Sequence, residues 1–317
     1  MGQGPSTSAS APGIGSGAGE KVRILEFNLF HDEHDALAIK QGEAARWIDE
    51  LHVCEATHSF RGRPKPASTL SSGTFLKPHL FDGARFHPEH AWGLSRHAPF
   101  FRRRDMARKN ETMQRNFVHE IFDPEDDDIV ILADIDEIID SRHADEIVDA
   151  ARRHGIVSIR LRHTFFYLNL LSTRFHEAWP GSPPDYAYRV FIMTGARFRT
   201  MRRTSDRLRR LGEWNRLAGE VPLLDGYRGY HHSWLGDAQA ARAKLASYAH
   251  RTEEHDPALV DPATGEITLD RLAQAIGEGR SLFPGDILER RPLDAIDALP
   301  FVAENRERFG HLVLEAA

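Results

Sequence analysis

The segment "DDDIVILADIDEI", residues 126–138, constrains the fold more than any other part of the chain. The run Ile129–Ala133 is apolar or small throughout, a pattern typical of a strand that is buried on both faces. Acidic residues precede this run, and Asp134, Asp136 and Glu137 follow it directly. Carboxylates this close repel one another and are costly to desolvate, so the end of the strand requires a source of positive charge.

A divalent cation would supply that charge. In open α/β sheets, ligands bind beyond the carboxyl ends of the strands, where Asp134 and Asp136 are expected. Alternate residues of an extended segment point the same way, so both carboxylates can approach one point. Such oxygen ligands suit Mg²⁺ or Mn²⁺, with open positions for phosphate oxygens. The alternative is that Asp134 caps a following helix and that the D-x-D spacing arises by chance among 47 acidic residues.

The order of the expected elements favours an α/β fold with a mostly parallel central sheet flanked by helices. Residues 21–30, 51–56, 128–133, 156–162 and 186–193 resemble strands, and 31–50, 105–122, 143–154, 237–251, 267–277 and 299–310 resemble helices. Residues 1–20 are rich in Gly, Ser, Ala and Pro, which predicts a disordered tail. No linker interrupts the remainder, so we expect one domain over residues 21–317.

Composition excludes several classes of protein. The net charge of −6 argues against a nucleic-acid partner. No segment approaches the ~20 apolar residues that a membrane span needs. The one cysteine, Cys54, predicts a reducing compartment and therefore a cytoplasmic location. The chain has no P-loop, no GxGxxG after its first strand, no GxSxG and no HExxH, which disfavours P-loop hydrolases, α/β-hydrolases and zincins.

Three further clusters allow both a structural and a functional interpretation. "FHDEHD", residues 30–35, either stabilises the start of a helix or binds zinc. The spacing of its histidines and acids matches no standard zinc pattern, which favours the helix start. "GYHHSW", residues 229–234, is expected in a turn-like setting, where His231 is either a structural histidine or a metal ligand. The arginine-rich stretches 102–104 and 202–210 either bind phosphate or, for most of their members, form a solvated surface.

Four ordered blocks resemble glycosyltransferase family seventeen, the family of the bisecting β-1,4-N-acetylglucosaminyltransferase. They are Leu29–Leu37, Val53–Pro66, the acidic segment 126–138, and Gly229–Trp234 followed by Lys244–Leu245. Asp32 stands where the family has asparagine, and Tyr230 where it has tryptophan. The C-terminal 60 or so residues match no known pattern.

The resemblance implies a GT-A fold and an inverting, metal-dependent transfer from a UDP-sugar, plausibly UDP-N-acetylglucosamine. The acceptor would be a hydroxyl of a glycan, a glycolipid or a glycosylated small molecule. It also implies roles for particular residues. These are metal binding for Asp134, Asp136 and His231, donor binding for Glu33, Glu55, Arg115 and Asp134, and a catalytic base at Glu213 or Asp185.

Two other functions fit part of the sequence. A phosphotransferase or phosphatase could use Asp134 as nucleophile, although such enzymes usually place Asp-x-Asp after the first strand. A carbohydrate-binding protein without catalysis could stack sugars on aromatic residues such as Phe165, Tyr167 and Trp234. Metal-dependent binding of a nucleotide would separate the transferase from the carbohydrate-binding protein.

Overall fold

The computed structural model describes residues 22–66, 70–88, 90–95, 98–174, 186–202, 204–247 and 255–315. The strands are β1 Ile24–Phe30, β2 Glu50–Ala56, β3 Leu76–Phe81, β4 His90–Ser95, β5 Ala98–Asp105, β6 Ile129–Asp134, β7 Glu137–Ile139, β8 Ile156–Phe165, β9 Leu170–Ser172, β10 Phe191–Thr194, β11 Leu223–Ser233 and β12 Leu288–Arg290. The α-helices are α1 His34–Ala44, α2 Ala107–Asn116, α3 Val118–Ile121, α4 Ala144–His154, α6 Gly195–Arg199, α7 Ser205–Glu213, α8 Ala238–Ser247, α9 Leu269–Gly277 and α10 Pro300–Glu304.

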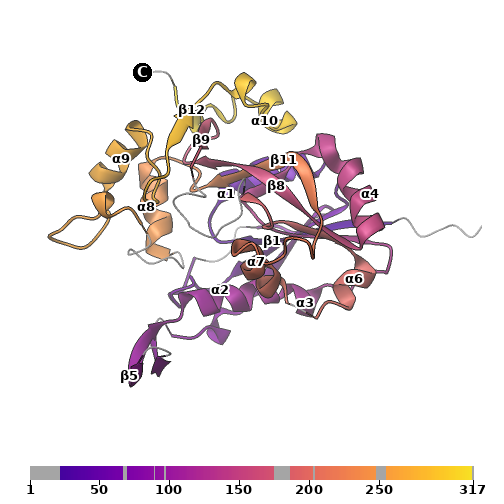
Figure 1. Ribbon diagram of the computed structural model, residues 1–317, viewed down its shortest axis with the longest axis horizontal. Helices are drawn as coiled ribbons and strands as arrows, with labels where there is room; N and C mark the ends of the chain where they lie inside the picture. Colours follow the sequence, from indigo (N-terminus) through magenta and orange to yellow (C-terminus); the bar gives the residue numbers. More distant parts are fainter. Residues whose placement is uncertain are drawn as a thin grey trace, which may run out of the picture.

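One large sheet organises the molecule (Figure 1). Its main path runs β12-β9-β8-β10-β6-β1-β2-β3. Strands β3, β2, β1 and β6 are parallel, β10 is antiparallel to both β6 and β8, and β8 therefore runs in the direction of β6. Strand β11 is parallel to β8 and also pairs with the short β7. This arrangement confirms the expected fold class, an α/β fold with a mostly parallel central sheet flanked by helices.

Both faces of the sheet are covered, which explains the unbroken apolar run of β6. Val130 and Leu132 point into one core with residues of α2, α3, α6 and α7. Ile129 and Ile131 point into the opposite core with residues of α1 and α4. In Figure 1, α2, α3 and α7 lie together below the sheet, whereas α4 lies to its right. A strand buried from both sides has no need of polar alternation.

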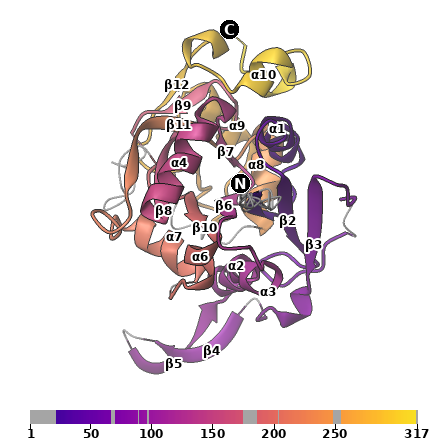
Figure 2. The same ribbon diagram turned by 90° about the vertical axis from the view of Figure 1, so that its right-hand side faces the viewer.

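The C-terminal part extends the sheet and closes one side of the molecule. Strand β12 pairs with β9, and α10 packs on α1. Figure 2 shows α10 at the top of the molecule, opposite the β4–β5 hairpin at the bottom. None of the described helices is both long and apolar enough to cross a membrane.

Several expected elements differ from those observed. The expected helix 105–122 is two helices that meet at Phe117, and the expected helix 299–310 ends at Glu304. The expected strand 186–193 begins only at Phe191, because Tyr186 and Tyr188 have positive φ angles that no strand allows. Residues 229–233 are not turn-like but form the end of β11. In the sequence, Gly229 indicates a turn. In the structure, its lack of a side chain instead allows β11 to approach β7 closely.

Candidate active site

A pocket that is open to solvent lies where β1, β6, β8 and β11 end. Its charged and histidine lining comes from distant parts of the chain: His31, Glu33, Arg108, Glu111, Arg115, Asp134, Asp136, His163, Arg189, Arg209, Glu213, His231 and Lys244. Five of these are Arg or Lys and five are Asp or Glu, so their formal charges cancel when the histidines are neutral.

Asp134 is held by two arginines. Arg115 of α2 donates to both of its carboxylate oxygens, at 3.2 and 3.1 Å, and Arg209 of α7 lies 2.8 Å from Oδ2. Arg209 also forms a two-pronged ion pair with Glu137, at 2.8 and 2.6 Å. Burial raises the pKa of Asp134, an effect that the two arginines oppose. The pKa of Glu137 falls to about 2, because Arg209 outweighs the opposing effect of burial.

Asp136 pairs with different cations. Its Oδ1 lies 3.5 Å from Nε2 of His231, and its Oδ2 lies 3.4 Å from Nζ of Lys244. The same ammonium lies 3.0 Å from Oε1 of Glu33, while Oε2 of Glu33 accepts a hydrogen bond from the His31 backbone at 2.9 Å. Burial alone would raise the pKa of Asp136, but His231 and Lys244 hold it well below its ordinary value. Lys244 therefore joins helix α8 to the acidic strand exit and to the start of α1.

The three residues expected to bind a metal line one pocket, but they do not form a three-ligand cluster. Asp136 and His231 face each other, whereas Asp134 faces Arg115 and Arg209. Across the described ranges, no group of three or more His, Cys, Asp or Glu side chains is arranged to hold a metal ion. The carboxylates already have protein cations as partners, so the arrangement does not fit the expected site. Metal binding by these residues stays a prediction.

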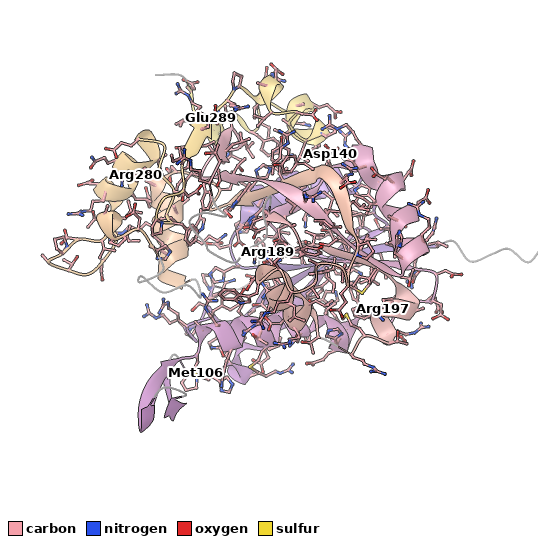
Figure 3. All side chains as sticks on the ribbon, viewed as in Figure 1. Met106, Asp140, Arg189, Arg197, Arg280 and Glu289 are labelled. Atoms are coloured by element: carbon pink, nitrogen blue, oxygen red, sulfur yellow. The ribbon has the colours of Figure 1, made fainter. Side chains whose placement is uncertain are left out.

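The other expected site residues have separate outcomes. Arg115 and Glu33 line the pocket, but Glu55 is absent from its lining and pairs with Lys65 at 3.1 Å. Glu213 lines the pocket and accepts a hydrogen bond from Arg189 at 2.6 Å. Figure 3 labels Arg189 near the middle of the molecule. Asp185 lies outside the described residues.

The two departures from the family pattern lie away from the pocket. Side chains of β11 alternate, so His231 and Ser233 face the pocket. Tyr230 and His232 instead stack on each other on the opposite face, with ring centroids 5.2 Å apart, beside the C-terminal segment. Asp32 is not among the pocket residues, and its side chain is 79% exposed. Neither of these two side chains therefore lines the pocket.

Sequence reasoning missed several pocket residues. Arg209 was grouped with an arginine-rich stretch expected to be mostly solvated, yet its side chain is only 9% exposed. The amphipathic spacing of α7, with Leu208 in the core, was the available signal that a neighbouring arginine is drawn inward.

Tyr186 was also missed, and its ring stacks on His231 with 4.1 Å between ring centroids. Tyr186 and Trp234 both have positive φ angles, a backbone strain that clusters at functional sites.

Comparisons with known proteins give only remote similarities. No protein-family model and no curated protein matches the chain. Residues 1–349 of TarS from S. aureus give a TM-score of 0.35 at 10% identity, covering 71% of this chain and 65% of that one. The glycosyltransferase GlyE of Streptococcus pneumoniae TIGR4 gives 0.29 at 10% identity, covering 65% and 45%. The galactosyltransferase LgtC, in complex with donor and acceptor sugar analogs, gives 0.29 at 14% identity, covering 93% and 97%.

The chain thus spans less than two thirds of the TarS fragment and of GlyE. Scores this low do not assign an activity.

Proposed function

We propose that this chain is a glycosyltransferase of the GT-A type that moves a sugar from a nucleotide-sugar donor to an acceptor hydroxyl. One observation carries the proposal: the four sequence blocks that share a family pattern meet at a single pocket. Glu33 comes from the first block, Phe60 from the second, Asp136 from the third, and His231 and Lys244 from the last. The first and last of these blocks are more than 200 residues apart in the sequence, and their convergence on one pocket supports a shared ligand.

The diphosphate of the donor fits the cationic part of the pocket. Arg115, Arg209 and Lys244 line it at the carboxyl ends of the parallel strands. In glycosyl transfer, negative charge develops on the departing diphosphate while the sugar acquires oxocarbenium character. Guanidinium and ammonium groups held in place before the reaction stabilise that charge without reorganising.

The acceptor fits the aromatic lining of the pocket, which consists of Tyr186, Trp234 and Phe283, with Arg189 and Glu213 in the same pocket. Aromatic faces pack on the apolar faces of sugars. An inverting transfer needs a base for the acceptor hydroxyl, and Glu213 is the candidate that the pocket contains. Burial opposes its ionisation, but Arg189 holds the pKa of Glu213 below its ordinary value, so the carboxylate is ionised at neutral pH. Asp185 stays an alternative base.

The finer assignments rest on the family resemblance. They are a UDP-sugar such as UDP-N-acetylglucosamine, inversion at the anomeric carbon, and a glycan, glycolipid or glycosylated small-molecule acceptor. The resemblance also implies dependence on Mn²⁺ or Mg²⁺, which we leave out of the proposal because Asp134 and Asp136 are paired with protein cations. The proposed cytoplasmic location rests on the presence of a single cysteine, Cys54, which is free and buried. No step above depends on a metal ion.

A thermal-shift panel tests the proposal. UDP-, GDP- and dTDP-sugars and the corresponding free sugars are each added with and without Mn²⁺ to wild type, Asp136→Ala and the exposed control Asp149→Ala. A ligand at ~100 times its dissociation constant adds roughly 2.7 kcal/mol, which gives a visible shift. We expect one nucleotide to stabilise wild type and the control but not Asp136→Ala. A shift with free sugars and with no nucleotide would instead favour a carbohydrate-binding protein.

A further inference from the structure

We propose that the pocket itself supplies the positive charge that faces the donor diphosphate, through Lys244, Arg115 and Arg209, so that donor binding needs no divalent cation. The inference rests on the proposed function, because it concerns the same diphosphate. It departs from the metal dependence that the D-x-D pattern suggests. We refer to these three side chains as the cation clamp.

The first argument is where the clamp residues lie. They come from three helices, α8, α2 and α7, yet all line the same pocket. Their side chains are 14%, 8% and 9% exposed. A cation this deeply buried is strongly destabilising unless it is paired, so the chain must provide each with an anion. Asp134, Asp136 and Glu33 are among those anions, and Glu111, Asp206 and Glu137 add to the partners of the two arginines.

The second argument is that the acids of the strand exit are already in use. Each oxygen of Asp134 accepts from Arg115, and Oδ2 is also bound by Arg209. The oxygens of Asp136 face His231 and Lys244, and those of Glu33 face Lys244 and the backbone N–H of His31. A divalent ion would have to displace these partners and bring Asp134 and Asp136 to one point. Asp134 and Asp136 thus orient the clamp residues, which explains why carboxylates stand at the end of β6.

The third argument is the match of chemistry. Arginine binds phosphate through paired N–H donors in fixed geometry, and lysine binds it as a compact charge. Trp234 lies against Lys244, with the ammonium 5.5 Å from the ring centroid, which limits where the side chain can move. The formal charges of the pocket cancel before the donor binds. The diphosphate therefore takes over the clamp residues from their carboxylates, whereas a metal-dependent site would bind it together with a cation, and titration with and without metal separates the two.

The test is calorimetric titration of the full chain with UDP, and in parallel with GDP and dTDP, in EDTA and in Mn²⁺. For the nucleotide that binds, we expect dissociation constants in the two buffers to agree within about threefold. Lys244→Met should weaken that binding about tenfold or more in EDTA, the loss expected for one charged hydrogen bond. Lys244→Arg should restore part of it. Arg242→Met, an exposed position on the same helix, should bind as wild type does.

A second ligand separates charge from folding. The nucleoside without phosphate, for example uridine, should bind Lys244→Met as well as wild type, which a merely misfolded variant would not do. Diphosphate binding that requires Mn²⁺, or that Lys244→Met leaves unchanged, overturns the clamp while the proposed function stands. Failure of every nucleoside diphosphate to bind in either buffer overturns both.

Discussion

The ammonium of Lys40 lies 2.6 Å from Oε1 of Glu26 in the interior between α1 and the sheet, and both side chains are almost fully buried. The same ammonium donates to Asn28 and, at 3.0 Å, to the backbone carbonyl of Asp134. A buried lysine on a helix thus holds the end of β6 in the position from which the acidic exit begins. This network fixes the backbone at Asp134, a pocket residue, although Lys40, Glu26 and Asn28 do not line the pocket themselves.

Replacing Lys40 with methionine should destabilise the fold by about 3–5 kcal/mol, because Glu26 would be left as a buried charge without its partner. Urea denaturation followed by circular dichroism measures this loss. Lys109→Met, at an exposed position on α2, is the matched control and should change stability by less than about 0.5 kcal/mol. A loss below about 1 kcal/mol at Lys40 would show that the pair is hydrated or dispensable.

Gly229 should tolerate no side chain. A Cβ built on it would lie 2.1 Å from the carbonyl oxygen of Ile138, and its φ of +153° is unfavourable for other residues. Gly229→Ala should therefore separate β11 from β7, displace His231 and lower both the melting temperature and nucleotide binding. Gly277→Ala has open space at its Cβ and serves as the control, expected to be neutral or stabilising. Unchanged binding in Gly229→Ala would mean that β7 does not position His231.

Tyr230 should matter for stability but not for binding. Its hydroxyl donates to the backbone carbonyl of Ile296 on the face of β11 opposite the pocket. Tyr230→Phe should cost about 1 kcal/mol, the usual value of one buried hydrogen bond. Nucleotide affinity, measured by the same titration in both proteins, should stay within about twofold. A clear change in affinity would show that the tryptophan-to-tyrosine difference from the family pattern affects the donor after all.

Local patterns predicted the elements that are periodic or uniformly apolar. The run Ile129–Ala133 is β6 almost to the residue, and helix 143–154 is α4, which Gly155 ends with a positive φ angle. The position of Asp136 at a strand end also followed from the pattern, and it lines one pocket with Glu33 and His231, which the family resemblance rather than strand geometry had assigned to the site.

What the sequence did not reveal are the partners of each charge. The helical spacing of α7 separates the inward Arg209 from the exposed Arg207, but nothing local identifies Glu137 as the partner of Arg209. Asp128 belongs to the same acidic segment as Asp134 but accepts hydrogen bonds from Arg23 at the start of β1 and serves the fold alone. These choices depend on contacts over long sequence separations, which a single sequence does not display. The supposed turn at 229–234 failed for the same reason, because β7 and β8 impose the strand.

His52 should make the fold sensitive to mild acid. It lies on β2 between Glu50, at 3.0 Å, and His79, at 2.8 Å, and burial lowers its pKa from 6.5 to about 4. Between about pH 4 and 6.5 the unfolded chain binds more protons at this residue than the native one, so stability falls as the pH falls through that window. The slope from one such group is at most about 1.4 kcal/mol per pH unit. Chemical denaturation across this range should show a smaller slope for His52→Gln than for wild type and for the exposed control His154→Gln. Equal slopes in all three proteins would place the acid sensitivity elsewhere.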